Sequence, residues 1–285
     1  MRFERYLTQV LAGVDGPGNA PGLSAAVRHA VFPGGARVRP LLCLAVARAC
    51  GHEQAPGALA AGAGIELLHC ASLIHDDLPC FDDAATRRGK PSVHRAFGER
   101  LAVLAGDALI VLAFQAISQE AACLPERRLA LLGTLARASG MPNGIVAGQA
   151  YECEEHIVLS DYQRAKTGAL FAAATMAGAQ AIGADAPAWR QVGECIGEAY
   201  QVADDICDAT AKEEDLGKPA GRDAALGRPN AVGSLGLDEA KLRLRGLVAG
   251  ALDAIPACPG ADGLRASILG VTEQLIRPRR ARPAA

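Results

Sequence analysis

Residues 73–89 of the chain read Leu-Ile-His-Asp-Asp-Leu-Pro-Cys-Phe-Asp-Asp-Ala-Ala-Thr-Arg-Arg-Gly. Two Asp-Asp pairs, at 76–77 and 82–83, follow the largely apolar segment 65–74. Carboxylates at this density cannot all ionise in a buried position unless cations neutralise them. Hard oxygen ligands without a companion His/Cys cluster indicate Mg²⁺. The stretch therefore predicts a magnesium site at the end of a helix.

A pair of arginines, Arg87 and Arg88, closes the same stretch. An arginine fork matches a phosphate group better than it matches the metal that the acids hold. Acids for a metal and arginines for phosphate together indicate a metal-bridged diphosphate. Read alone, the stretch also fits a solvated acidic loop with ordinary surface arginines.

A second acidic cluster favours the diphosphate site. Asp204, Asp205 and Asp208 follow the segment 197–203, which has no helix breaker after its glycine. On a helix, residues 204 and 208 are spaced i, i+4 and project from one face, where like charges repel unless a cation lies between them. Two such clusters on separate helices could hold several Mg²⁺ ions around one diphosphate.

The composition limits the class of protein. The chain has 285 residues, of which 50% are hydrophobic and 21% charged, so it can bury a large core. Its net charge of −2 gives no basic footprint for nucleic acid. The odd number of cysteines, nine, without a C-x-x-C pair, fits reduced thiols rather than a disulfide framework or a zinc site. Charged residues at the N-terminus do not resemble a secretory leader, and we expect a cytoplasmic protein.

The chain reads as almost wholly helical. Alanine and leucine dominate the long segments, and only 4% of the residues are aromatic. The uncharged segment 167–184 is too weakly apolar for a stable membrane span and predicts a buried core helix. We expect one all-α domain over residues 1–285, because no repeat and no long linker divides it. The expected helices cover residues 2–14, 23–32, 36–49, 56–77, 101–120, 125–139, a short one ending near 155, one from 161, 187–208, 238–255 and 260–276.

The structural role of several other segments is less clear from the sequence. The segment 215–229, rich in glycine, proline and charge, predicts a mobile flap near the site, and residues 277–282 form a basic tail. Gln149 and the acidic run 152–155 fit the border of a cavity and a solvated helix end equally well. His69, taken alone, is typical of a core histidine.

Five segments, in this order, resemble the trans-polyprenyl diphosphate synthases. They are residues 34–40 (Gly-Gly-Ala-Arg-Val-Arg-Pro), 76–89, 166–168 (Lys-Thr-Gly), 201–208 and 216–218 (Leu-Gly-Lys). The resemblance implies the isoprenoid synthase fold, a helical bundle around a central cavity with the two aspartate motifs facing each other across its mouth. It also implies a homodimer and a Mg²⁺ cofactor. The stretch 67–83 is further similar to the geranylgeranyl diphosphate synthases of bacterial carotenoid pathways.

The resemblance assigns roles residue by residue. It implies metal ligands at Asp76, Asp82 and Asp204, assisted by Asp77, Asp83, Asp205 and Asp208. It implies contacts to the allylic diphosphate from Arg87, Lys166 and Lys218. It implies contacts to isopentenyl diphosphate from Arg39, His69 and Arg88. It implies that the oxygens of Thr167 and Gln201 line the reacting carbon, where they and Lys166 serve catalysis.

These groups suit an ionisation reaction. Metal and cationic side chains stabilise a leaving diphosphate, an allylic carbocation forms, and the isopentenyl double bond attacks it. Two positions depart from the family pattern: Ala36 stands where a lysine is usual, and residues 227–229 read Gly-Arg-Pro where a second flap lysine is usual. The first departure predicts a weaker contact to isopentenyl diphosphate.

Product length follows from the helix before Asp76. In the family the growing chain descends along this helix, and a small Ala71 five residues earlier leaves room past fifteen carbons. Leu67 and Leu68, a turn further down, could form the next floor. We expect a geranylgeranyl (C20) product from a dimethylallyl, geranyl or farnesyl primer, with a farnesyl (C15) product as the alternative.

Two other classes of protein stay open. A terpene cyclase shares the first acidic motif, but such enzymes usually replace the second aspartate cluster with an Asn/Ser/Glu pattern. A non-catalytic synthase subunit is the other possibility, kept open by Ala36. Both aspartate motifs are intact in this chain, which favours a prenyltransferase.

Overall fold

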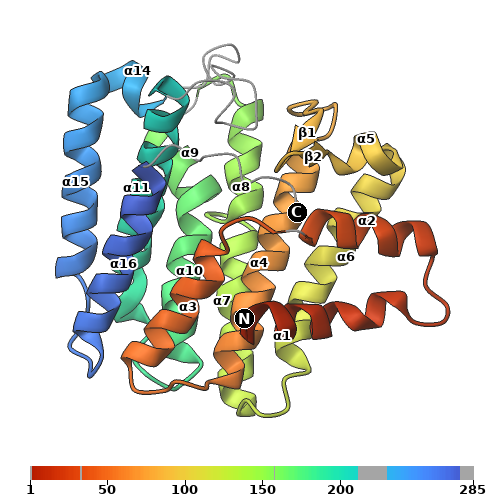
Figure 1. Cartoon of the computed structure of the whole chain (residues 1–285), viewed down its shortest axis with the longest axis horizontal. Coiled ribbons are helices and arrows are strands. Elements are labelled where there is room, and N and C mark those ends of the chain that lie inside the picture. Colours follow the sequence, from red (N-terminus) through yellow and green to blue (C-terminus); the bar gives the residue numbers. More distant parts are fainter. Residues whose placement is uncertain (1, 33, 157, 211–229, 277–285) are drawn as a thin grey trace.

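A computed structural model describes residues 2–32, 34–156, 158–210 and 230–276. The segment 215–229, including Lys218, and the basic tail 277–282 lie outside the described residues, so their predicted roles stay predictions. The described part is a helical bundle with a single two-residue hairpin (Figure 1). The all-α prediction is confirmed.

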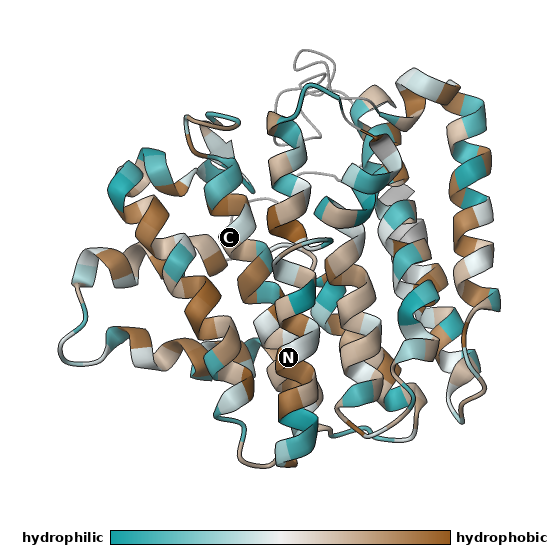
Figure 2. Ribbon diagram, turned by 180° about the vertical axis from the view of Figure 1, so that it is seen from behind, coloured by the Kyte–Doolittle hydropathy of each residue, from teal (hydrophilic) through white to brown (hydrophobic). Residues whose placement is uncertain are grey.

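The centre of the bundle is helix α4 (Pro56–Asp76), which packs against α3, α6, α7 and α10. Pro56 starts the helix, where its fixed φ is favourable, and Pro79 follows its end. All residues from Gly57 to Leu68 are buried, and all of them except Glu66 are apolar. Figure 2 shows hydrophobic residues gathered in the middle helices and hydrophilic residues frequent near the helix ends.

The remaining elements surround α4. Helices α11 and α10 pack together, and α15 and α16 cover α11 on its outer side. The helical elements that precede α7 are α1 (Arg2–Val10), η1 (Leu11–Asp15), α2 (Pro21–Val31), α3 (Val38–Ala49), α5 (Val93–Phe97) and α6 (Glu99–Ser118). Those from α7 onward are α7 (Pro125–Ser139), α8 (Ile145–Ala150), η2 (Tyr151–Cys153), α9 (Leu159–Gln163), η3 (Arg164–Gly168), α10 (Ala169–Gln180), η4 (Pro187–Trp189), α11 (Arg190–Thr210), α14 (Ala231–Leu235), α15 (Leu237–Asp253) and α16 (Ala261–Ile276).

The long helices match the expected ranges within a few residues, and three differences are informative. The expected helix 36–49 begins at Val38, because Arg37 has φ +52 and cannot continue a right-handed helix. The helix from 161 begins at Leu159 and contains a π-helical turn, η3. The expectation missed α5, α14 and the hairpin of β1 (Thr86–Arg87) and β2 (Lys90–Pro91).

Among the residues that the structure describes, two helices, α4 and α6, are long and apolar enough to cross a membrane by length and composition. The apolar window of α4 is 83% buried, as expected for a core helix, and that of α6 is 39% buried. The uncharged segment 167–184 was expected to be a core helix, and residues 170–179 of α10 are indeed buried.

Gly178 allows α10 to approach α3 closely. A Cβ at this position would lie 2.4 Å from the Cys43 carbonyl oxygen and 2.9 Å from the Val46 Cβ. We expect Gly178→Ala to lower the free energy of unfolding by about 1–3 kcal/mol, because backbone and a β-branched side chain must move. The measurement is urea denaturation.

The matched control is Gly246→Ala. Gly246 is exposed on α15, and an added Cβ meets no atom within 4 Å. This change should raise stability by about 0.5–1 kcal/mol, since alanine favours a helix interior. Equal effects of the two substitutions would contradict the close approach of α10 and α3.

Candidate active site

The two acidic clusters lie at the same end of the bundle. Asp76 is the last residue of α4 and Asp204 lies near the end of α11, and Figure 1 shows these helix ends beside the hairpin and α14, respectively. Asp82 lies in the loop after α4, where its backbone N–H donates to the Asp76 carbonyl at 3.0 Å. The helix that carries one acid thus also positions the loop that carries the next.

The first aspartate contacts a lysine from the middle of the chain. Lys166 Nζ lies 3.3 Å from Asp76 Oδ1 and also pairs with Glu152 Oε1. Burial raises the pKa of Asp76, the Lys166 charge opposes that rise, and the charges of Asp82 and Glu152 add to it. A further cation among these carboxylates would therefore stabilise their ionised forms.

Glu152 belongs to the site. The sequence alone left its position undecided. Its side chain is only 11% exposed, and it accepts hydrogen bonds from Tyr162 Oη at 2.6 Å and Gln149 Nε2 at 3.1 Å. The reading of the run 152–155 as a solvated helix end is wrong for its first residue. Residues 153–155 are exposed.

The residue after Lys166 contacts the second acidic helix. Thr167 Oγ1 donates to Gln201 Oε1 at 3.0 Å, and Gln201 Nε2 donates to Asp205 Oδ1 at 2.9 Å. The other oxygen of Asp205 accepts the Ala231 N–H at 2.7 Å, and this carboxylate is 5% exposed. Asp205 therefore orients Gln201 and anchors α14, and its assisting role at the metal stays a prediction.

Glycine 148 makes this arrangement possible. A Cβ at this position would lie 2.4 Å from the Lys166 backbone nitrogen. The close approach of α8 to the π-helical turn η3 places Lys166 and Thr167 between the two acidic helices.

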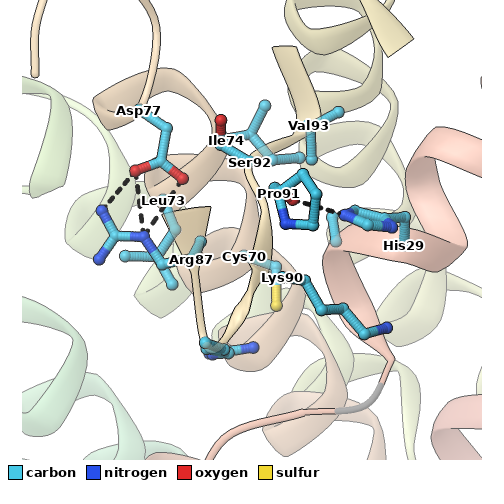
Figure 3. Close-up of a pocket in the computed structure, with 12 residues that line it drawn as sticks. His29, Cys70, Leu73, Ile74, Asp77, Arg87, Lys90, Pro91, Ser92 and Val93 are labelled. Atoms are coloured by element: carbon cyan, nitrogen blue, oxygen red, sulfur yellow. Dashed lines mark hydrogen bonds and ion pairs between the residues drawn. The ribbon is translucent and has the colours of Figure 1, made fainter. Parts of the chain in front are cut away.

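Arg87 forms an ion pair that the sequence did not predict. Its Nε donates to Asp77 Oδ1 at 3.0 Å and its Nη2 to the same oxygen at 2.5 Å (Figure 3). The second aspartate of the first pair is buried, at 2% exposure, and burial raises its pKa while Arg87 opposes the rise. Asp77 thus holds the arginine and the hairpin beside Asp76.

Asp83 contacts residues of α5. It is exposed, has φ +44, and pairs with Arg95 Nη2 at 2.8 Å, and His94 Nε2 lies 3.5 Å from its Oδ1. Its contacts fix the loop after α4 against α5. A direct role at the metal stays a prediction for this residue, as it does for Asp208 on α11.

A cavity lies beneath the hairpin, between α2 and α4. Its volume of about 30 Å³ is enough for water. Figure 3 shows the side chains that surround it. They include His29, Cys70, Leu73, Ile74, Asp77, Arg87, Arg88 and Lys90.

Arg39 is prepared for an anion. Its guanidinium lies over the rings of Phe171, at 4.4 Å, and Tyr200, at 5.8 Å. Its Nε is buried and has no hydrogen-bond partner among the described residues. Burial lowers the pKa of Arg39, which remains a cation.

His69 lies on α4 near this arginine. Burial first, and then the charges of Arg39 and Arg88, hold the pKa of His69 well below its ordinary value. The ring is therefore neutral at neutral pH. It can act as a hydrogen-bond donor or acceptor but adds no charge.

The acids fit a hard divalent cation in their chemistry. Carboxylate oxygens are the ligands that Mg²⁺ prefers, and the raised pKa of Asp76 shows that its ionised form lacks sufficient compensation. Among the described residues, however, no three His, Cys, Asp or Glu side chains converge on one point. Asp76, Asp82 and Asp204 therefore stay predicted ligands.

Comparison with known proteins identifies the family. Residues 20–250 match the polyprenyl synthetase family. The chain belongs to this family. The match covers most of the chain and includes both aspartate clusters, the arginine pair and the π-helical turn.

Individual relatives extend the similarity over nearly the whole chain. The chain is 50% identical over 280 residues to a geranylgeranyl diphosphate synthase of Cereibacter sphaeroides, with 97% of each chain covered. The crystal structure of an FPP/GFPP synthase from Zymomonas mobilis is 34% identical, with a TM-score of 0.80 over 95% of this chain and 97% of that one. A Helicobacter pylori geranyltransferase complexed with magnesium and isoprenyl diphosphate is 29% identical, with a TM-score of 0.80 over 95% and 96%. Polyprenyl synthetases and this chain therefore share the fold.

The depressed pKa of His69 predicts a pH effect on stability. The unfolded state binds the proton more readily, so stability from the neutral ring is present above about pH 6.5 and is lost as pH falls below it. Between about pH 7.5 and about pH 5.5, wild type should lose more free energy of unfolding than His69→Gln, by up to about 1.4 kcal/mol per pH unit. Urea denaturation at both pH values measures this difference.

The comparison of wild type with His69→Gln also controls for the buried aspartates. Asp76 and Asp77 have raised pKa values and contribute with the opposite sign, but they do so in both proteins. Parallel pH profiles of wild type and His69→Gln would refute the neutral ring.

Proposed function

We propose that this protein is a Mg²⁺-dependent geranylgeranyl diphosphate synthase that condenses isopentenyl diphosphate with an allylic diphosphate. The observation that carries the proposal is the convergence of Lys166, Asp76 and the Thr167–Gln201 pair at one end of the bundle. The 50% identity to the Cereibacter sphaeroides enzyme supports the substrate class and the C20 product. The magnesium in the Helicobacter pylori complex supports the cofactor.

The reaction breaks the C–O bond of the allylic diphosphate and forms a C–C bond to isopentenyl diphosphate. One proton then leaves the new intermediate, and diphosphate can accept it. Bound Mg²⁺, held by Asp76, Asp82 and Asp204, would neutralise the leaving diphosphate. Lys166 and Arg87 add positive charge on the same side, and each is held in place by an acid.

Thr167 and Gln201 act near the reacting carbon in this proposal. Their hydrogen bond directs the Gln201 amide oxygen toward the threonine hydroxyl, and Asp205 fixes the amide nitrogen. Oxygen dipoles held this way stabilise a carbocation without reacting with it. Arg39, His69 and Arg88 bind isopentenyl diphosphate, and Lys218 contributes from outside the described residues.

The test is incubation of the purified chain with isopentenyl diphosphate, Mg²⁺ and each of dimethylallyl, geranyl and farnesyl diphosphate. Elongation to C20, abolished by EDTA and restored by Mg²⁺, supports the proposal. Release of a hydrocarbon indicates a terpene cyclase. Activity that requires a partner chain indicates a non-catalytic subunit, and a product that stops at C15 indicates a farnesyl diphosphate synthase.

The protein forms a homodimer through α6 in this proposal. Val103, Leu104 and Val111 are 42%, 51% and 56% exposed on the outer side of this apolar helix. A second copy covers them more readily than water does. Sedimentation velocity measures the oligomeric state, and a monomer at micromolar concentration contradicts the dimer. A cytoplasmic location is part of the same proposal.

Ala71 sets the product length. It is 2% exposed on α4, five residues or about 7.5 Å before Asp76 along the helix axis. We expect Ala71→Phe to stop elongation at C15 or C10, because a ring there fills the path of the growing chain. Chain length by liquid chromatography and mass spectrometry is the measurement.

Ala71→Ser is the matched control. It changes polarity with little change in size and should keep the C20 product. Thermal unfolding of both variants shows whether the larger ring disturbs the core, since overpacking costs about 1–3 kcal/mol. An unchanged product from a folded Ala71→Phe would rule out this floor.

A further inference from the structure

Glu66 is a buried carboxylate that the sequence did not single out. It lies on α4 and is 2% exposed. A buried carboxylate is costly unless cations compensate it. Its Oε1 lies 2.6 Å from Arg37 Nη1 and 3.9 Å from Arg88 Nη2. One acid on the central helix therefore holds arginines from two separate segments of the chain.

Arg37 is fully used by the protein. Besides its bond to Glu66, its Nε donates to Glu4 at 2.9 Å and its Nη2 to the Val31 carbonyl at 2.8 Å. Its side chain is 6% exposed. All three nitrogens of the guanidinium thus have partners within the protein, and Arg37 serves as a support rather than as a ligand.

Arg88 is held differently. Its distance of 3.9 Å to Glu66 is too long for a hydrogen bond, so the carboxylate attracts the guanidinium without using its donors. The side chain is 23% exposed and comes from the tip of the hairpin, where Arg88 has φ +54. It lies against Gly35, where an added Cβ would be 3.2 Å from its Nε.

The surroundings of Glu66 carry excess positive charge. Glu66 pairs with Arg37, lies 3.9 Å from Arg88 and interacts electrostatically with Arg39. The other acid at Arg37 is Glu4, whose side chain is 41% exposed. One buried acid for three arginines leaves charge for an anion such as a diphosphate.

We propose that Glu66 is a positioning residue for isopentenyl diphosphate. It fixes Arg37 and through it the Gly34–Gly35 loop, where a Cβ at Gly34 would overlap the Arg37 guanidinium. It also attracts Arg88 beside that loop without a hydrogen bond to its guanidinium. The inference rests on the proposed function. It assigns to Glu66 a role in the affinity for isopentenyl diphosphate and none in the affinity for the allylic diphosphate.

The test is Glu66→Gln, which keeps the shape and removes the charge. We expect the KM for isopentenyl diphosphate to rise about 10-fold or more, because Arg88 loses the charge that holds it. The KM for the allylic diphosphate should stay within about twofold, since Asp77 holds Arg87 independently. The matched control is Glu4→Gln, which removes the exposed acid from Arg37 and should leave both KM values within about twofold.

A second variant guards against misfolding. Arg37→Gln with Glu66→Gln removes both buried charges, so neither is left unpaired, and it should show the same selective rise. Circular dichroism establishes that each variant is folded. A rise in both KM values indicates a merely structural role and overturns the proposal, as does a folded Glu66→Gln with an unchanged KM for isopentenyl diphosphate.

Direct binding separates this inference from the proposed function. Calorimetric titration with isopentenyl diphosphate needs no turnover. If wild type transfers no prenyl group, the proposed function fails, and the titration still decides the role of Glu66. Weaker binding by Glu66→Gln than by wild type supports the role, and equal binding or no binding by wild type overturns it.

Discussion

The site depends on two consecutive residues that contact different helices. Within a regular α-helix, neighbouring side chains point about 100° apart. In the π-helical turn η3, Lys166 contacts Asp76 at the end of α4, and Thr167 contacts Gln201 on α11. This turn therefore connects the two acidic clusters, and the close approach of Gly148 keeps it in place.

The two adjacent arginines at this end of the bundle contact different acids. Arg87 and Arg88 are adjacent, yet one pairs with Asp77, just after α4, and the other lies near Glu66, eleven residues earlier in the chain. A tight hairpin turn, with positive φ at Arg88 and Gly89, separates the two side chains. Two neighbouring cations can thus face two different anions at once.

The sequence predicted the helices better than it predicted the side chains that hold the site residues in place. Helix α7 has the expected bounds because Pro125 and Gly140 mark its ends locally. The acidic clusters and Lys166 could be found because their spacing is local or resembles a family motif. Glu66 and Glu152 could not, since their partners lie 29 and 14 residues away and are set by packing. The hairpin was missed because two-residue strands leave no periodic pattern.

Three non-glycine residues have positive φ in the described part of the chain, and all three lie in this region: Arg37, Asp83 and Arg88. A left-handed conformation costs a residue with a Cβ about 1–2 kcal/mol. Selection for heat resistance alone, in a library of variants, would therefore favour glycine at Asp83 and Arg88, whereas at Arg37 the loss of the buried pair with Glu66 outweighs that gain. Arginine and aspartate there oppose that trend. Directed evolution toward stability and toward turnover should consequently diverge at codons 83 and 88 first.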